Sequence, residues 1–481
     1  MARSSSSSQR VWKGLKSFLR TNRLSLAAGS VLTGLAVTGL VLSTDDQADR
    51  HSHALQKLSK ALPLFQAFRA DPTQPAPLLW KRRLGVKPAT QIWNRLGRGI
   101  WWQGWSVDGE AYLVLPTNLL TAEERARAIA HPLDGLEVLS ADGLNQQFLR
   151  QQLDSTDSSG VDTSPLLSSC LRRLAREPSV IWGPEALARF SGATAPLLQS
   201  GGYGCLSLRV RNGHLQWHGW VGSRNLAGAP SSLKPDREGF SDEDLWSGKG
   251  EQQRTANAFD LMMMEGAQLG VLLSALESRE IIRRPLERNY ALSGVQRTKL
   301  LQTPFRLRLV ARPQGAFKAG LQLQLWPQAD RQSIDSSLQA LTDRLNQQGL
   351  VQEGSGNVIW RDSDPLDQTV LGGWRWLQPQ SARPTISLGL GMEPSTVPLP
   401  SLSDQAARPG ILLDLRARPA DLMTRGLLDG KWPRVVKQAP TLSLRLRRLS
   451  SDRDASAWSE LSGQLELPVA EDSTSTDAPS S

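Results

Sequence analysis

Few residues of this 481-residue chain have the type and spacing that metal binding requires. His214 and His218 fall on one face of a predicted strand, where two imidazoles could hold a metal ion. Arg209 and Arg211 belong to the same face, and their positive charge opposes a cation there. An exposed polar strand face is therefore the expected structure.

Two acidic stretches, around Asp242 and around Asp362, lack the spacing of a calcium-binding loop. The chain has no G-x-S-x-G and no H-E-x-x-H motif, and its one S-x-x-K match, Ser231 to Lys234, has no partner motif. We therefore predict no catalytic residue, no metal and no cofactor. A hydrolase whose site assembles from distant carboxylates remains an alternative.

Tryptophan is the one unusual residue type, with 16 copies against three tyrosines. Tryptophan side chains can stack on sugars or line an apolar groove, but they also fill ordinary cores. The candidate ligand surface consists of Trp101, Trp102, Trp105, Trp217, Trp374 and Trp376.

Only two cysteines are present. Cys170 lies in a predicted helix and Cys205 at the start of a predicted strand. They could form one disulfide bond in an oxidising compartment or remain two separately buried thiols, and the sequence leaves both open.

The positive charge lies mainly at the start of the chain. The formal net charge is +10, and residues 1–23 carry six bases and no acid, so the rest holds 50 bases and 46 acids. This distribution argues against a nucleic-acid-binding surface. Residues 24–44 contain no charge and would span about 31 Å as a helix, enough to cross a bilayer. Because the bases precede this segment, we expect a cytoplasmic N-terminus, an uncleaved single-pass anchor and an extracytoplasmic body; a cleaved signal peptide is the rival.

Helices are predicted where caps and periodicity coincide. Thr121 and Glu124 form a capping box, Pro165 begins a helix, and residues 337–347 are amphipathic. The longest candidate helix runs from about Thr255 to Arg284 and ends at Pro285. His51 and His53 are expected in a solvated stalk after the anchor.

Alternating residues predict β-hairpins. The strongest signal is Asn212-Gly213, a type I′ turn that would pair Arg211 with His214 and Leu208 with Trp217. Three further hairpins are expected at residues 99–115, 305–326 and 441–467.

Residues 179–222 and 410–468 share one order of elements, namely strand, proline-led helix and hairpin, which predicts an internal repeat facing a common apolar interior. The expected fold class is α+β: an N-terminal transmembrane helix followed by antiparallel sheets with flanking helices. The predicted regions are a basic cytoplasmic N-terminus (1–23), an anchor (24–44), a first extracytoplasmic α+β region (45–227), a polar loop (228–253), a central helix and hairpin region (254–392), a Pro/Ser linker (393–410), a C-terminal repeat unit (411–468) and a disordered tail (469–481).

The anchor, the Ser/Arg-rich start and the final G-x-L-x-LP motif, Gly463 to Pro468, resemble a cyanobacterial family of single-pass membrane proteins of unknown function. This resemblance implies a large periplasmic or lumenal α+β region held to the inner or thylakoid membrane. It transfers no functional residue. We therefore expect a membrane-anchored binding or scaffold protein of the cell envelope, for an apolar ligand such as lipid or for an envelope protein. An envelope-polymer binder that uses exposed tryptophan, for sugar or peptidoglycan, is the second possibility.

Overall fold

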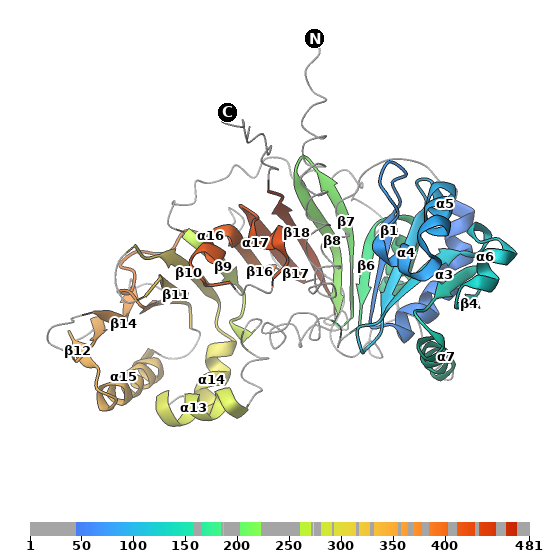
Figure 1. Cartoon of the computed structure of the whole chain (residues 1–481). Helices are drawn as coiled ribbons and strands as arrows, with labels where there is room; N and C mark the ends of the chain where they lie inside the picture. Colours follow the sequence, from blue (N-terminus) through green and yellow to red (C-terminus); the bar gives the residue numbers. More distant parts are fainter. Residues whose placement is uncertain are drawn as a thin grey trace, which may run out of the picture.

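The computed structural model defines an α+β protein whose strands form one continuous antiparallel sheet (Figure 1). The described residues are 45–157, 165–183, 186, 203–222, 260–270, 273, 280–290, 293–313, 317–327, 331–354, 357–363, 369–377, 384–402, 411–428, 432–448 and 458–468. The predicted anchor, the polar loop 228–253 and the tail 469–481 lie outside them. Within the described part of the chain, no helix combines the length and the hydropathy that crossing a membrane requires.

Within the described residues the sheet contains eighteen strands, and each is paired antiparallel to its neighbours. The strands of the N-terminal half are β1 (Leu64–Arg69), β2 (Ile100–Trp105), β3 (Ala111–Pro116), β4 (Ala130–Leu133), β5 (Leu136–Leu139), β6 (Ser179–Trp182), β7 (Gly204–Arg211) and β8 (His214–Gly222). The strands of the C-terminal half are β9 (Asp260–Gly266), β10 (Phe305–Ala311), β11 (Ala319–Leu325), β12 (Val351–Glu353), β13 (Asn357–Arg361), β14 (Val370–Leu377), β15 (Thr385–Leu390), β16 (Ile411–Ala417), β17 (Leu442–Arg448) and β18 (Trp458–Glu466).

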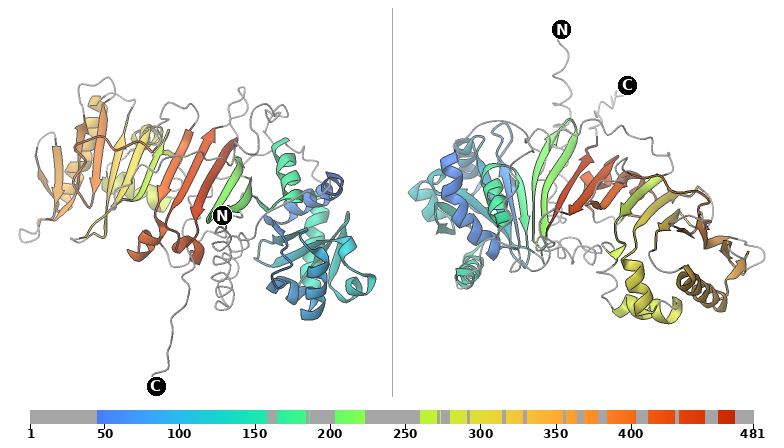
Figure 2. Two further views of the ribbon diagram at one scale, coloured as in Figure 1. Left: turned by 90° about the horizontal axis from the view of Figure 1, so that it is seen from above. Right: turned by 180° about the vertical axis from the view of Figure 1, so that it is seen from behind.

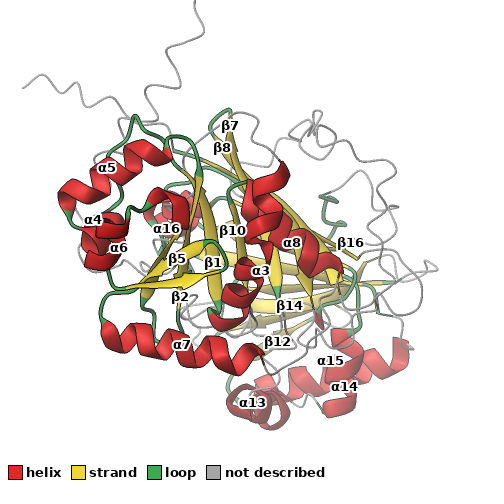
Figure 3. Ribbon diagram, turned by 90° about the vertical axis from the view of Figure 1, so that its right-hand side faces the viewer, coloured by secondary structure: helices red, strands yellow, loops and turns green. Residues whose placement is uncertain are grey.

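The helices lie on both sides of this sheet in the N-terminal half (Figure 3). They are α3 (Asp45–Ala61), α4 (Leu78–Leu84), α5 (Val86–Leu96), α6 (Ala122–Arg127), α7 (Gly143–Asp157) and α8 (Pro165–Arg176). A short 3₁₀ helix covers Thr117–Leu119. The C-terminal half contains α13 (Glu280–Tyr290), α14 (Gly294–Leu301), α15 (Arg331–Gln347), α16 (Pro419–Thr424) and α17 (Arg434–Lys437).

Local sequence signals were reliable. The capping box of Thr121 and Glu124 is formed at the start of α6. The predicted hairpin turns at Asn212 and Gly213, whose φ angles are 51° and 76°, and it pairs Leu208 with Trp217 as expected. The other three hairpins are also formed.

The strand–helix–hairpin order occurs more often than the sequence indicated. Unit 1 is β1, α4–α5, β2 and β3; unit 3 is β9, α13–α14, β10 and β11; unit 4 is β16, α16–α17, β17 and β18. Unit 2 is β6, β7 and β8, and the proline-led helix predicted between its first two strands falls almost wholly on residues outside the described ones. Within each unit the first strand pairs with the second, and the second with the third.

The four units join edge to edge in the order 1, 2, 4, 3 (Figures 1 and 2). First strands pair between units 1 and 2 and between units 4 and 3, whereas the third strands β8 and β18 pair between units 2 and 4. Units 2 and 4 therefore do not face each other across an interior, because the free edges of their hairpins satisfy each other within one sheet. Their apolar faces still share one cluster, in which Leu215 lies opposite Leu465.

Two helix predictions are also wrong. Residues 260–266 of the expected long helix form strand β9, which lies between β10 and β16. A short apolar run such as Leu261–Met264 fits a buried strand as well as a helix, and here the two neighbouring strand edges decide. Pro285 does not end a helix but lies inside α13.

No stalk separates the body from residue 44. Residues 45–61 form α3, and Ala54, Leu55 and Leu58 of this helix are fully buried in the core. His51 is buried as well and lies edge-on to Trp102, so the solvated stalk is a wrong prediction for this residue. The His53 side chain is 65% exposed, but its Nδ1 lies 2.7 Å from Asp134 Oδ2 of the body.

Candidate functional site

One face of the sheet changes from apolar to polar between the two halves of the molecule. In the N-terminal half α3, α7 and α8 cover one face, and α4 and α5 cover the other, so both faces are core (Figure 3). Following the strand register into the C-terminal half, the first face becomes polar and the second stays apolar. Both continuations are candidate sites.

The polar face carries a row of directly paired polar residues, which we call the polar row. Each member lies opposite the next on the neighbouring strand, perpendicular to the strand direction. The polar row consists of Ser179, Ser207, His218, Ser462, Arg445, Asp414, Glu265, Arg306, Gln324, Ser387, Arg375 and Asn357.

Two carboxylates meet in the middle of the polar row. Asp414 and Glu265 lie opposite each other on β16 and β9. Asp414 Oδ2 accepts hydrogen bonds from Arg445 Nε at 3.0 Å and Nη2 at 2.8 Å, and Glu265 Oε2 lies 3.2 Å from Arg306 Nε. An acid–base pair needs one carboxyl group that stays neutral. Here each carboxylate has its own arginine, so the pair has a structural role.

Ser207, His218 and Glu460 have the residue types of a hydrolase triad. Ser207 lies opposite His218, and His218 Nε2 is 2.9 Å from Glu460 Oε1, a bond that lowers the pKa of Glu460 against the opposing effect of its burial. However, the Ser207 hydroxyl donates to Glu177, not to the imidazole. Ser207 and His218 are also only 2% and 7% exposed, so a substrate could not reach them.

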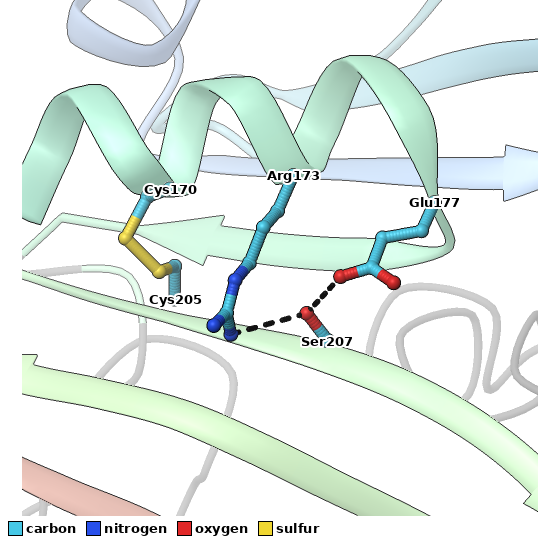
Figure 4. Close-up of a disulfide and its surroundings, with 5 residues drawn as sticks. All are labelled: Cys170, Arg173, Glu177, Cys205 and Ser207. Atoms are coloured by element: carbon cyan, nitrogen blue, oxygen red, sulfur yellow. Dashed lines mark hydrogen bonds between the residues drawn. A yellow bond between two sulfur atoms is a disulfide. The ribbon is translucent and has the colours of Figure 1, made fainter. Parts of the chain in front are cut away.

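A disulfide bond holds α8 on the polar face beside this cluster (Figure 4). It joins Cys170 of α8 to Cys205 of β7, with 5.9 Å between the Cα atoms. Further along the helix, Arg173 donates to Ser207 Oγ at 3.4 Å and its guanidinium lies 4.1 Å from the ring centre of Trp220. The polar hairpin face expected to be exposed is thus covered at Ser207 and His218.

A second segment covers the polar face further along the sheet. After β15 the chain crosses β11, β10 and β9 before it enters β16, and side chains of these strands bind residues 397–402, which we call the strap. The predicted Pro/Ser linker 393–410 therefore begins as a segment bound to the sheet, while residues 403–410 lie outside the described residues.

The apolar face carries a matching row across six strands, which we call the central row. Its members are Leu444, Leu415, Met264, Leu307, Leu323 and Leu388. All except Met264, which is 9% exposed, keep an intermediate exposure to solvent. Six strands span about 24 Å at the usual strand spacing.

Helices cover the apolar face at both ends of these strands but less completely between them. Leu422 of α16 packs with Ala417 and Leu309 at one end, and Leu300 of α14 packs with Phe305 and Leu413 at the other. Figure 1 shows α16 and α14 at opposite ends of β9 and β10. The central row lies between the two covered ends.

Most of the tryptophans predicted to form a ligand surface are core residues instead. Trp101, Trp102, Trp105 and Trp374 are 5% exposed or less, while Trp217 and Trp376 are partly exposed. Several rings stand over a glycine of the neighbouring strand: a Cβ on Gly463 would lie 2.5 Å from the ring of Trp217, and one on Gly204 would lie 2.1 Å from the ring of Trp182. These indoles fill space that the paired glycines leave open, as a core requires.

The structure assembles no metal site from the predicted donors. His214 Nδ1 is within 3.0 Å of the Asn212 carbonyl oxygen, and His218 contacts Glu460. Across the described ranges no group of three or more His, Cys, Asp or Glu residues is placed to hold an ion. Asp362 is described, whereas the acidic stretch around Asp242 lies outside the described residues.

Neither the polar row nor the central row was predicted from the sequence, although the alternation that separates the two faces of each strand is visible there. Alternation of charged and apolar residues in β10, β11, β16 and β17 defines the two faces of each strand. Which strands pair, and therefore which side chains line up, depends on contacts between segments distant in the chain, such as Glu265 with Asp414 and His218 with Ser462. Comparison with known proteins found no matching family, no similar curated protein and no similar solved structure.

Proposed function

We propose that this chain is a membrane-anchored extracytoplasmic binding protein of the cell envelope, and that it holds an apolar ligand, such as a lipid acyl chain, on the central row. The observation that carries the proposal is the incomplete cover over the central row, in which five of the six adjacent apolar positions keep an intermediate exposure. Burying partly exposed leucines under a ligand gains about 25 cal/mol per Å² of apolar surface. A span of about 24 Å suits an extended hydrocarbon chain.

Two features support the proposed location outside the cytoplasm. The disulfide between Cys170 and Cys205 requires an oxidising compartment to persist. The charge-free segment 24–44, with its bases on the N-terminal side, has the composition of an anchor whose N-terminus is cytoplasmic. The inner or thylakoid membrane is the proposed site, in line with the cyanobacterial resemblance.

The start of α3 at Asp45 refines this picture. Because the described residues are helical from Asp45 and Ala54, Leu55 and Leu58 already lie in the core, no long spacer would separate the body from an anchor at residues 24–44. A protein held in this way is close to a source of lipid. We also propose that the four units arose by internal duplication, on the basis of their common order and pairing.

The test is binding of a fluorescent fatty acid to the full-length protein in detergent-free nanodiscs and to the purified body. We expect Leu307→Gln and Leu323→Gln to weaken binding at least tenfold, about 1.4 kcal/mol, because each places an amide within the central row. The matched control is Leu144→Gln, which changes a leucine that is 80% exposed on α7.

Equal affinity of the central-row variants and the control would contradict the proposal. Mass spectrometry of lipids that co-purify with the protein identifies the ligand class. Envelope-polymer binding has no comparable support, since four of the six tryptophans it would use are buried.

A further inference from the structure

The strap is bound by side chains in the way that a protein binds a peptide. Gln324 Nε2 donates to the Val397 carbonyl oxygen at 2.9 Å, and Gln324 Oε1 accepts from the Leu399 amide at 2.8 Å. Arg306 Nη1 donates to the Leu399 carbonyl oxygen at 2.9 Å. Gln324 itself is fully buried, so these bonds are formed away from bulk water.

The next two strands continue the same pattern. Glu265 Oε2 accepts from the Leu402 amide at 3.2 Å and from Ser401 Oγ at 3.0 Å. Arg416 Nη2 donates to the Leu402 carbonyl oxygen at 3.1 Å. Apart from the Ser401 hydroxyl, every strap group in these contacts belongs to the backbone, and backbone recognition accepts many sequences.

The strap has the composition of an extended peptide ligand. Pro398 and Pro400 alternate with the strap residues that bond to the sheet. Proline has no amide hydrogen, and the strap amides that donate to the sheet belong to Leu399 and Leu402 instead. Proline also holds a segment extended and lowers the entropy that binding costs. Leu399 and Leu402 are buried at 3% and 9% exposure, whereas Val397 is 62% exposed.

The polar face beside the strap has more hydrogen-bonding capacity than the strap uses. Gln322 Oε1, Ser387 Oγ and Arg375 Nε are buried and have no hydrogen-bond partner among the described residues. Ser387 lies directly between Gln324 and Arg375 in the polar row. Buried polar atoms are normally bonded to protein, water or ligand, so these three mark a site that another occupant could satisfy better.

We propose that the polar face of β9, β10, β11 and β16, continued onto the neighbouring strands β15 and β14, is a peptide-binding site, which the chain fills in part with its own strap. A proline-alternating segment of another protein, with the pattern apolar-Pro-apolar-Pro-Ser-apolar, displaces the strap and takes its place. This site is separate from the lipid surface proposed above, because it lies on the opposite face of the same strands.

The probe is a fluorescein-labelled peptide with the sequence of residues 393–402, added to the full-length protein. The wild-type strap competes from within the same chain, so we expect weak binding. Leu399→Ser removes a buried strap side chain, and this variant should bind the peptide at least tenfold more tightly. Adding Gln324→Ala to that variant should abolish the gain, while Val295→Ser, which changes a 68% exposed residue on α14, should leave binding at the wild-type level.

A folded Leu399→Ser protein with no gain in peptide affinity would overturn the proposal, as would a gain that survives Gln324→Ala. If Leu399→Ser does not fold, hydrogen exchange of the wild-type protein decides the question. Excess peptide should then remove protection from the Leu399 and Leu402 amides, and unchanged protection would again overturn the proposal.

Discussion

The N-terminal half, residues 45–222, and the C-terminal half, residues 260–468, are each built around two units of three strands with the same order and pairing, yet they cover their sheets differently. In the N-terminal half, α3, α7 and α8 complete a second core on the face that is polar in the other half. In the C-terminal half, the strap alone crosses that face within the described residues, and the apolar face is covered mainly at the strand ends.

This difference shows that the helices and segments packed on a sheet face, and not the alternation of residues within its strands, decide whether the face becomes core or binding surface. β7 and β17 have nearly the same sequence, LSLRVR and LSLRLR, with apolar and polar residues on opposite faces. On β7 the apolar Leu208 is 7% exposed, whereas the equivalent Leu444 on β17 remains partly exposed. A substitution should therefore cost more in the N-terminal half than at a matching position in the C-terminal half.

The largest effect is expected for Trp102→Ala. Trp102 is 2% exposed, and its indole nitrogen donates to the Leu174 carbonyl oxygen at 2.8 Å, so the change leaves a cavity and an unpaired acceptor. The expected loss in unfolding free energy is about 5 kcal/mol. The control is Trp376→Ala in the C-terminal half, where the ring is partly exposed and about 1–2 kcal/mol is expected. Equal losses of unfolding free energy for the two variants in denaturant titrations would refute the conclusion that the sheet faces of the two halves are covered to different extents.

The next effect concerns the disulfide. Its cysteines are 35 residues apart, and closing a loop of this size stabilises the folded state by about 4 kcal/mol in the chain-entropy model. Reduction should therefore destabilise the N-terminal half, observed as faster hydrogen exchange in β6 and β7 than in β10 and β11. A reductant should have no effect on the Cys170→Ala, Cys205→Ala double variant. Uniform acceleration of exchange across both halves would show that the halves unfold as one unit.

A smaller effect is expected at the seam between the halves, where β8 pairs with β18. Replacing glycine by alanine in a strand normally stabilises a protein through the unfolded chain. At Gly463 the sign should reverse, because a Cβ would lie 2.5 Å from both the Trp217 ring and the Ser443 carbonyl oxygen. We expect Gly463→Ala to cost about 2 kcal/mol and the neighbouring Ser462→Ala less than about 0.5 kcal/mol in thermal unfolding. A stabilised Gly463→Ala protein would mean that the seam is looser than described.

The sequence predicted what depends on neighbouring residues. The turn at Asn212-Gly213 and the capping box at Thr121 were correct because their geometry follows from a few adjacent side chains. Strand β9 was missed because its identity depends on β10 and β16, which lie far away in the chain. The polar row, the strap and the burial of Trp101 could not be predicted for the same reason, since alternation defines the faces of a strand but not what covers them.

The smallest effect on stability is expected for two carboxylates, one in each half. Burial raises the pKa of Glu137 in β5 above its ordinary value of 4.5, and the nearby Arg125 offsets this only in part. The hydrogen bond with His218 lowers the pKa of Glu460 in β18. A raised pKa in the folded protein means that ionised Glu137 costs stability, which is recovered as the pH falls towards 4.5. A lowered pKa means that Glu460 contributes stability at neutral pH, which is lost as the pH falls below 4.5.

The two carboxylates should therefore give opposite results when each is replaced by glutamine. At neutral pH, Glu137→Gln should leave the protein as stable as the wild type or slightly more stable, whereas Glu460→Gln should destabilise it, each by about 1 kcal/mol or less. The benefit of Glu137→Gln should vanish as the pH approaches 4.5, and the cost of Glu460→Gln should vanish only below that value. Urea titrations at a series of pH values measure both curves. Curves of the same sign would mean that the two carboxylates share one environment, which their different surroundings, an apolar strand face and a histidine-bearing polar face, argue against.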